Sequence, residues 1–264
     1  MNLQDLLAVL GVVLNGIPQG LLALSYGFAA LPTALAFLVG AVGVWAFNTV
    51  APISFQAETI TLVGRMGSNM RERLSILFWE GVLMTLIGSF GLLEGIVDLI
   101  GPQITNAMMA GVGIMLAYVA VEMGLSSPWV AAASVAVALP VWAFTNNLVH
   151  TITWSVLAGT LVGRFVPFTP VEPTAERERF QLQPLIWKFW QSPTVIRGAL
   201  SLAMLNIGAN ITFGKITGQI ANASVNVDHL AVYSSLADVS SALFGGSPVE
   251  SIISATGAAP HPQL

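Results

Sequence analysis

The sequence predicts an all-α integral membrane protein, with the inverted seven-span repeat of a transporter and broken third and tenth segments. Composition is the first observation: 55% of the 264 residues are hydrophobic and 8% are charged, whereas soluble domains carry about 25% charge. The second is the stretch from Leu74 to Gly163, which contains no Lys or Arg. Since one crossing takes about 20 apolar residues, this stretch crosses several times. The third is a set of interrupted, polar segments in two halves of the chain.

Charge and cysteine content exclude several classes of function. Nine Lys and Arg against thirteen Asp and Glu give a net charge of −4, which is unsuited to nucleic-acid binding. The chain has no cysteine, so thiolate metal sites and cysteine nucleophiles are absent. The three histidines, His150, His229 and His261, have no spacing typical of a zinc site. We therefore expect no enzyme, no catalytic residues, no metal and no cofactor.

Seven apolar or interrupted segments precede the most hydrophilic stretch. The third is polar and contains proline and a glutamate, which suits a broken segment that lines a cavity rather than a lipid-facing helix. Gly101-Pro102 indicates a short connection between the fourth and fifth spans. The expected segments are 6–26, 31–47, 51–60 (broken), 74–93, 107–123, 129–144 and 148–165.

A proline-rich, charged linker then separates two unequal parts. Residues 169–183 hold most of its charges, and the Trp187–Trp190 run (Trp-Lys-Phe-Trp) is typical of a membrane interface. The predicted organisation is a first seven-span repeat over 1–166, a linker with an interfacial segment over 167–194, and the start of a second repeat over 195–264. The second part has expected spans at 195–214 and 230–244 and a broken tenth segment from Gly245.

The two parts share a repeated spacing between an asparagine and a glutamate. Asn15 precedes Glu58 of the broken third segment by 43 residues, and Asn206 precedes Glu250 of the broken tenth segment by 44. Duplicated halves whose interrupted segments meet at mid-membrane are a known transporter design. Because seven spans is an odd number, the second repeat is inverted relative to the first, and we expect it to be incomplete, lacking its last four spans.

The candidate binding residues lie in the broken segments and the eighth span. A carboxylate inside a span costs about 2.5–3.5 kcal/mol on insertion scales, so Glu58 and Glu250 are expected to face a cavity or a partner. Asn206 and Asn210 share one helix face, and amides can read the donor and acceptor edge of a planar heterocycle, although they also serve to join helices. Gln56 and Ser247, polar residues of the same two broken segments, complete the candidate site.

Two other acids of the apolar stretch are assigned differently. Glu80 lies two turns into the fourth span and Glu122 lies at the end of the fifth. A structural or interfacial role is favoured for both.

Several stretches together resemble the nucleobase–cation symporter type 2 family (xanthine and uracil permeases), in particular its purine permease branch. They are Gly91–Pro102, Ala110–Ala117, Ser235–Asp238, Gly245–Ser251 and Ala255–Gly257. The resemblance implies fourteen spans in two inverted repeats, a core domain and a gate domain, a homodimer, and uptake of nucleobases driven by a proton gradient across the cell membrane.

The resemblance also implies roles for particular residues. The family's tenth-segment glutamate falls on Glu250, which would hold the base and couple protons. The eighth-segment position, a carboxylate in this branch, falls on or beside Asn206 and Asn210, which cannot titrate. The expected partners are thus a purine, a proton and the lipid bilayer.

Two further functions remain open from the residues alone. One is an anion transporter or channel of the same architecture, against which Glu250 argues. The other is a non-transporting membrane protein. The orientation in the membrane is also open. The positive-inside rule places the Arg65–Arg73 loop and the linker in the cytoplasm, and therefore the N-terminus outside. The resemblance instead implies a cytoplasmic N-terminus.

Overall fold

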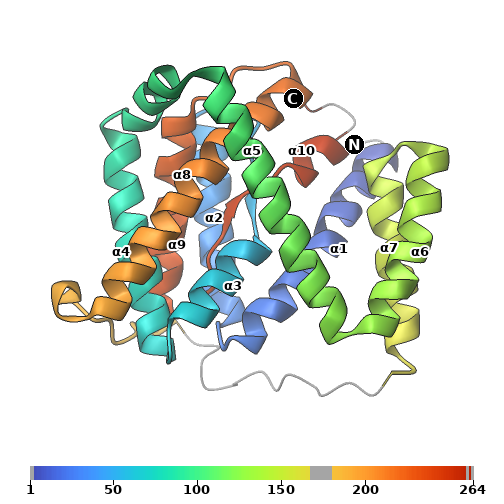
Figure 1. Cartoon of the computed structure of the whole chain (residues 1–264), viewed down its shortest axis with the longest axis horizontal. Coiled ribbons are helices and arrows are strands. Elements are labelled where there is room, and N and C mark those ends of the chain that lie inside the picture. Colours follow the sequence, from blue (N-terminus) through green and yellow to red (C-terminus); the bar gives the residue numbers. More distant parts are fainter. Residues whose placement is uncertain (1–2, 167–179, 260–261, 263–264) are drawn as a thin grey trace.

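The computed structural model describes residues 3–166, 180–259 and 262, and it is predominantly helical (Figure 1). Two very short strands interrupt the helical order at the positions of the two expected broken segments. The elements are α1 (Leu3–Ser25), α2 (Ala30–Ala46), β1 (Ile53–Ser54), α3 (Ala57–Met66), α4 (Met70–Ser89), α5 (Leu92–Ser126), α6 (Pro128–Thr145), α7 (Leu148–Gly163), η2 (Phe189–Gln191), α8 (Pro193–Ala221), α9 (Val227–Phe244), β2 (Glu250–Ser251) and α10 (Ser254–Ala258).

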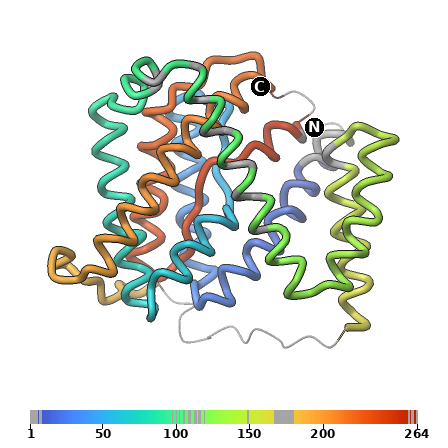
Figure 2. The backbone as a smooth tube through the Cα atoms, viewed as in Figure 1, coloured from blue at the N-terminus to red at the C-terminus, as the bar shows by residue number. Residues whose placement is uncertain are grey.

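The helices form two groups on either side of α5. Helices α4, α8 and α9 pack together at one side, with α2 behind them against α9, whereas α6 and α7 form a pair at the other side, where α7 contacts α1 (Figure 1). The backbone trace shows α5 running obliquely between the groups (Figure 2). The antiparallel pair β1–β2 lies in the interior, so segments about 200 residues apart in the chain meet near the centre.

The outer surface is apolar, as expected for a protein solvated by lipid. Helix α6 has no buried residue although its sequence is almost entirely apolar, and Phe144 on it is 90% exposed. A helix this apolar and this exposed suits lipid and not water. Among the described residues, Pro128–Thr145 and Pro193–Ala221 are helices long and apolar enough to cross a membrane, with mean hydropathies of 1.5 and 1.3.

The predicted all-helical membrane fold with two broken segments is confirmed, and the expected spans correspond to helices with shifted ends. The fourth begins at Met70 rather than Leu74, because the side chain of Asn69 caps it by accepting a hydrogen bond from Glu72 N at 3.0 Å. The eighth extends to Ala221 instead of Gly214. The break expected at Gly101-Pro102 is present as a kink inside α5: Gly101 has a positive φ of 70° and a ψ of 176°, which are not helical, so α5 consists of two helices joined there.

The linker predicted over 167–194 is described only from residue 180 onward, and residues 167–179 lie outside the described part. The remainder is fastened to α4: Trp79 Nε1 donates to Ile186 O at 3.0 Å, and Ile186 N donates to Ser75 Oγ at 2.8 Å. Trp187 and Trp190 are 58% and 61% exposed, which agrees with an interfacial position.

Glycines let α4 approach α9 closely. An added Cβ at Gly81 would lie 2.9 Å from the carbonyl oxygen of Ser235, and one at Gly88 would lie 2.7 Å from that of Asp228. Both pairs are seven residues apart, so one glycine face of α4 follows one backbone face of α9 over two turns. This contact brings the polar residues of the two helices together.

A reciprocal cap joins the start of α5 to the start of α9. The two carboxylate oxygens of Asp228 accept hydrogen bonds from Leu93 N and Glu94 N, at 2.8 and 3.0 Å, and Glu94 Oε1 accepts one from Val227 N at 3.1 Å. Each acid therefore satisfies the unpaired N–H groups at the start of the other helix. Asp228 is buried, so water does not replace it.

Asp228→Ala should lower the free energy of unfolding by about 1–3 kcal/mol, because two buried N–H groups lose their acceptors. Thermal unfolding of the detergent-solubilised protein measures this loss. Asp228→Asn keeps one acceptor oxygen, so its melting temperature should lie between those of the wild type and Asp228→Ala. Equal melting temperatures for wild type and Asp228→Ala would show that the cap contributes nothing.

Candidate functional site

The candidate site is built around the two broken segments. Ile53 pairs with Ser251 and Ser54 pairs with Glu250 in the antiparallel β1–β2 ladder. Pro52 and Pro248 lie just before the two strands, and proline cannot continue a helical hydrogen-bond ladder, so the chain is extended there. The pairing satisfies backbone groups that have no helical partner, which is what membrane interiors require of irregular backbone.

Side chains from neighbouring segments hold the broken segments together. Gln56 Nε2 donates to Ser251 O at 3.1 Å, and Asn15 Nδ2 donates to Ser254 Oγ at 3.1 Å. The first bond links the region between β1 and α3 to β2, and the second links α1 to α10. The expected meeting of the third and tenth segments is therefore confirmed, with α1 attached to the tenth.

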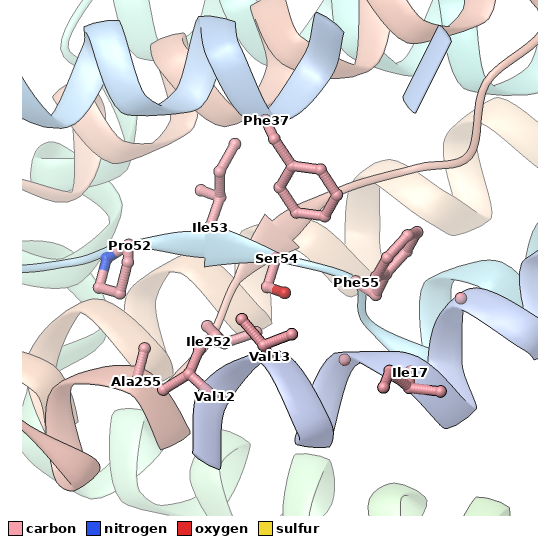
Figure 3. A pocket seen from close by; sticks show the side chains of 12 residues that line it. Val12, Val13, Ile17, Phe37, Pro52, Ile53, Ser54, Phe55, Ile252 and Ala255 are labelled. Carbon is pink, nitrogen blue, oxygen red and sulfur yellow. The ribbon is translucent and has the colours of Figure 1, made fainter. Parts of the chain in front are cut away.

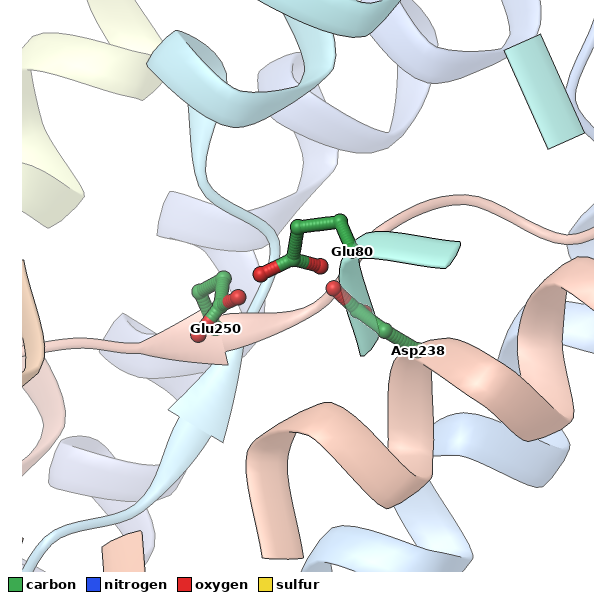
Figure 4. A group of neighbouring side chains, drawn as sticks. All are labelled: Glu80, Asp238 and Glu250. Carbon is green, nitrogen blue, oxygen red and sulfur yellow. The ribbon is translucent and has the colours of Figure 1, made fainter. Parts of the chain in front are cut away.

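Three buried carboxylates converge beside the strand pair. Glu80 of α4, Asp238 of α9 and Glu250 of β2 point toward one another (Figure 4), and one oxygen from each lies within 4.8 Å of the others. All three residues are at most 1% exposed. We call Glu80, Asp238 and Glu250 the carboxylate centre.

Amide groups bind one oxygen of each acid in the carboxylate centre. Asn206 Nδ2 donates to Glu80 Oε1 at 2.9 Å and also to Glu250 Oε1, while Val249 N donates to Asp238 Oδ1 at 2.7 Å. Asn206 itself is fully buried on α8. The single ion pair within the described residues, Arg65–Glu122, is exposed and lies elsewhere, so no described basic side chain neutralises the centre.

A cavity lies beside the same strand pair. It has a volume of about 430 Å³ and is bounded by α1, α2, β1 and the segment that leads into α10 (Figure 3). Phe37 and Phe55 contact each other edge to face in its wall, with ring centroids 5.0 Å apart. Its lining is otherwise mostly aliphatic, with the Ser54 hydroxyl as a polar side chain: Val12, Val13, Gly16, Ile17, Gly20, Phe37, Pro52, Ile53, Ser54, Phe55, Ile252 and Ala255.

The cavity and the carboxylate centre are separate but adjacent. Ser54 lines the cavity, and its partner across the ladder is Glu250. Glu250 itself is not among the lining residues, and its carboxylate is bonded to Asn206. A volume of this size suits a small molecule.

The structure brings together some of the predicted site residues and separates others. Glu250 and Asn206 are directly bonded. Asn210 is fully buried one turn further along α8, and neither of its amide atoms has a hydrogen-bond partner among the described residues. Glu58 is buried on α3, and its Oε1 likewise has no donor among those residues.

Gln56 and Ser247 are occupied in holding the backbone. Gln56 bridges to Ser251, as described above. Ser247 N donates to Thr33 Oγ1 at 2.8 Å, and Ser247 O accepts from Ser241 Oγ at 2.6 Å. These bonds attach the start of the tenth segment to α2 and α9.

Sequence reasoning missed two members of the carboxylate centre. Glu80, for which a structural or interfacial role was favoured, is fully buried and bonded to Asn206, so it lies away from any interface. In the sequence, Asp238 stands out only as the last residue of Ser235–Asp238, one of the stretches that resemble the symporter family. The available signal was an acid inside an apolar span, which by itself marks a functional position. Glu122, by contrast, is partly exposed and pairs with Arg65, in agreement with an interfacial role.

Comparison with known proteins gives a fold and no family. No family model matches the chain, and no curated protein matches it. Among solved structures, the transmembrane domain of a cyanobacterium bicarbonate transporter, BicA, is similar with a TM-score of 0.62 over 98% of this chain and 80% of that chain, at 13% sequence identity. The chain therefore has the fold of a transporter membrane domain, with the inverted-repeat architecture that the sequence predicts.

Proposed function

We propose that the protein is a secondary active transporter of nucleobases, above all purines, and that it couples their uptake to protons. The observation that carries the proposal is the adjacency of a ligand-sized cavity and a buried carboxylate centre across the β1–β2 pair. Sites at the meeting point of two interrupted segments are typical of secondary transporters.

The cavity suits an uncharged planar molecule. Phe37 and Phe55 supply flat apolar surface in its wall, and Ser54 with the backbone of the broken segment supplies polar groups at one edge. A ring of alternating donors and acceptors can bind such a polar edge while its faces contact the apolar wall. We therefore propose that the base binds beside Ser54 rather than on the Glu250 carboxylate, which is engaged with Asn206.

The carboxylate centre suits a coupling role. Three acids close together in a buried site repel when all are ionised, so the protonation of each one depends on that of the others. Glu250 sits in the ladder opposite Ser54, so a change in its protonation acts directly on the backbone that lines the cavity. Asn206 contributes hydrogen bonds to this centre but cannot titrate.

Anion transport is the second candidate, and the fold similarity to a bicarbonate transporter favours it. The three acids argue against it, because an anion next to an ionised centre would be repelled. Among the residues that the structure describes, no Lys or Arg lines the cavity.

An uptake panel separates these functions. The full-length protein, expressed in cells that lack their own permeases, is given labelled adenine, hypoxanthine, xanthine and uracil, with bicarbonate and sulfate as comparators. The proposal expects uptake of at least one purine that rises with an inward proton gradient. Uptake of bicarbonate or sulfate alone would establish the second candidate, and uptake of none would refute transport of these classes.

Purine analogues should bind in proportion to the polar edge that they retain. An analogue lacking one donor or acceptor leaves a buried partner unpaired, which costs about 1–3 kcal/mol and lowers affinity by about 5- to 150-fold. Competition by each analogue against the best labelled purine measures this. Equal inhibition by all analogues would show that the protein does not recognise the hydrogen-bonding edge of the purine.

A further inference from the structure

One oxygen atom of each acid in the carboxylate centre has no hydrogen-bond partner among the described residues. Each acid has one oxygen bonded to an amide, as described above, whereas its other oxygen has no donor within the described residues. These unpartnered atoms are Glu80 Oε2, Asp238 Oδ2 and Glu250 Oε2. Figure 4 shows the three side chains converging from α4, α9 and β2.

Asn206 adds a fourth oxygen from a different helix. Its Nδ2 donates to both Glu80 and Glu250, so the amide group lies at the edge of the centre. The oxygen of the same amide, Oδ1, has no partner among the described residues, although Asn206 is 0% exposed. A buried amide oxygen of this kind is normally satisfied by an ordered water or an ion.

The donor set selects the kind of ligand. It contains carboxylate and amide oxygens only, without nitrogen or sulfur, and such sets suit hard cations. It also gathers three acids where no described Lys or Arg reaches them, and buried acids without such a partner are neutralised by protons or by a bound cation. Mg²⁺ fits poorly, because it keeps several waters and the four side chains are sealed from solvent.

We propose that Glu80, Asp238, Glu250 and Asn206 form a binding site for one dehydrated hard cation, Na⁺ or Ca²⁺, held by side-chain oxygens from α4, α8, α9 and β2. A cation there joins all four elements. It therefore stabilises the packing of the broken tenth segment against the helices behind it. Because metal ligands must be deprotonated, a cation and protons are alternative occupants of the centre. The site goes beyond the proposed function and is independent of which substrate is carried.

Ligand-dependent stability tests the site without any transport. The full-length, detergent-purified protein is melted in choline chloride and in NaCl, KCl, CaCl₂ or MgCl₂ at equal ionic strength and pH 8. A cation at about 100 times its dissociation constant should raise the melting temperature by roughly 5–10 °C. We expect this rise with Na⁺ or Ca²⁺ over choline, and a smaller one with Mg²⁺.

Matched variants locate the effect. Glu80→Gln and Asp238→Asn each remove one anionic ligand while keeping the shape, and each should reduce the shift at least by half. Glu122→Gln removes an acid outside the centre and should keep the full shift. Should a variant fail to fold, binding of radioactive ²²Na⁺ or ⁴⁵Ca²⁺ to the wild-type protein still decides the question.

Two results would overturn the proposal: a wild-type melting temperature that is equal in choline, Na⁺ and Ca²⁺, or a shift that Glu80→Gln, Asp238→Asn and Glu122→Gln all retain. Either can occur while nucleobase uptake succeeds, and the uptake panel can fail while the cation shift is present. Failure of the cation site is thus distinguishable from failure of the proposed function.

Discussion

Glu250→Gln should abolish nucleobase accumulation driven by a pH gradient while sparing exchange of nucleobase across the membrane. The substitution keeps the size of the side chain but removes its charge and its titration. Asn206 can still bond the new amide, because its own amide can turn to present the Oδ1 that is unpartnered in the wild type. The fold and the cavity beside Ser54 should therefore survive, while the proton step does not.

Two assays on full-length protein in liposomes separate these effects. With one pH unit imposed, a one-to-one proton symporter can concentrate its substrate about tenfold, since a tenfold ratio corresponds to about 1.4 kcal/mol. We expect wild-type accumulation near this limit and no accumulation by Glu250→Gln, with counterflow exchange retained by both. Glu122→Gln, which changes an exposed acid paired with Arg65, is the matched control and should accumulate normally. Normal accumulation by Glu250→Gln would remove Glu250 from the coupling mechanism.

Gly81→Val should destabilise the protein by about 3 kcal/mol or more. Any Cβ at this position would lie 2.8 Å from Val239 Cγ2 and 2.9 Å from the carbonyl oxygen of Ser235, and a backbone oxygen cannot move aside as a side chain can. Helix α4 must then move away from α9, which separates Glu80 from Asp238. Thermal unfolding should show the loss of stability, and the cation-dependent shift should disappear with it.

Gly95→Val is the matched control for this substitution. Gly95 also lies in a helix, but no atom lies within 4 Å of an added Cβ. Valine there should change the free energy of unfolding by about 0.5 kcal/mol or less, with a small gain because glycine is the poorer helix former. Similar melting temperatures for Gly81→Val and Gly95→Val would show that the close approach of α4 and α9 is unimportant.

Much of the fold is predictable from the sequence because lipid restricts what a chain can form. The long stretch without Lys or Arg allows only helices, and the proline, glutamine and glutamate between Pro52 and Glu58 do not suit one of them. The exact ends of the helices are harder to predict from the sequence. The cap formed by Asn69 starts α4 within a polar stretch, four residues before the apolar run begins, whereas the break predicted at Gly101-Pro102 does occur, as a kink between the two helices that make up α5.

The site was predictable where spacing alone placed residues. The matched distances from Asn15 to Glu58 and from Asn206 to Glu250 predicted that the broken segments meet, and Asn206 does bond Glu250. Pairings across helices were not predictable in this way. Glu80 joins Asn206 over 126 residues only because Gly81 and Gly88 let α4 approach α9, and no local pattern reveals that contact.

The central claim is that binding of an uncharged nucleobase moves protons through the carboxylate centre. Its most direct test adds a purine to liposomes that contain the full-length protein, in sodium-free buffer without a pH gradient, and records the external pH. We expect the external medium to become more alkaline when the purine is added, but not when sulfate is added and not with Glu250→Gln. Purine uptake by the wild type with no change in external pH would contradict it.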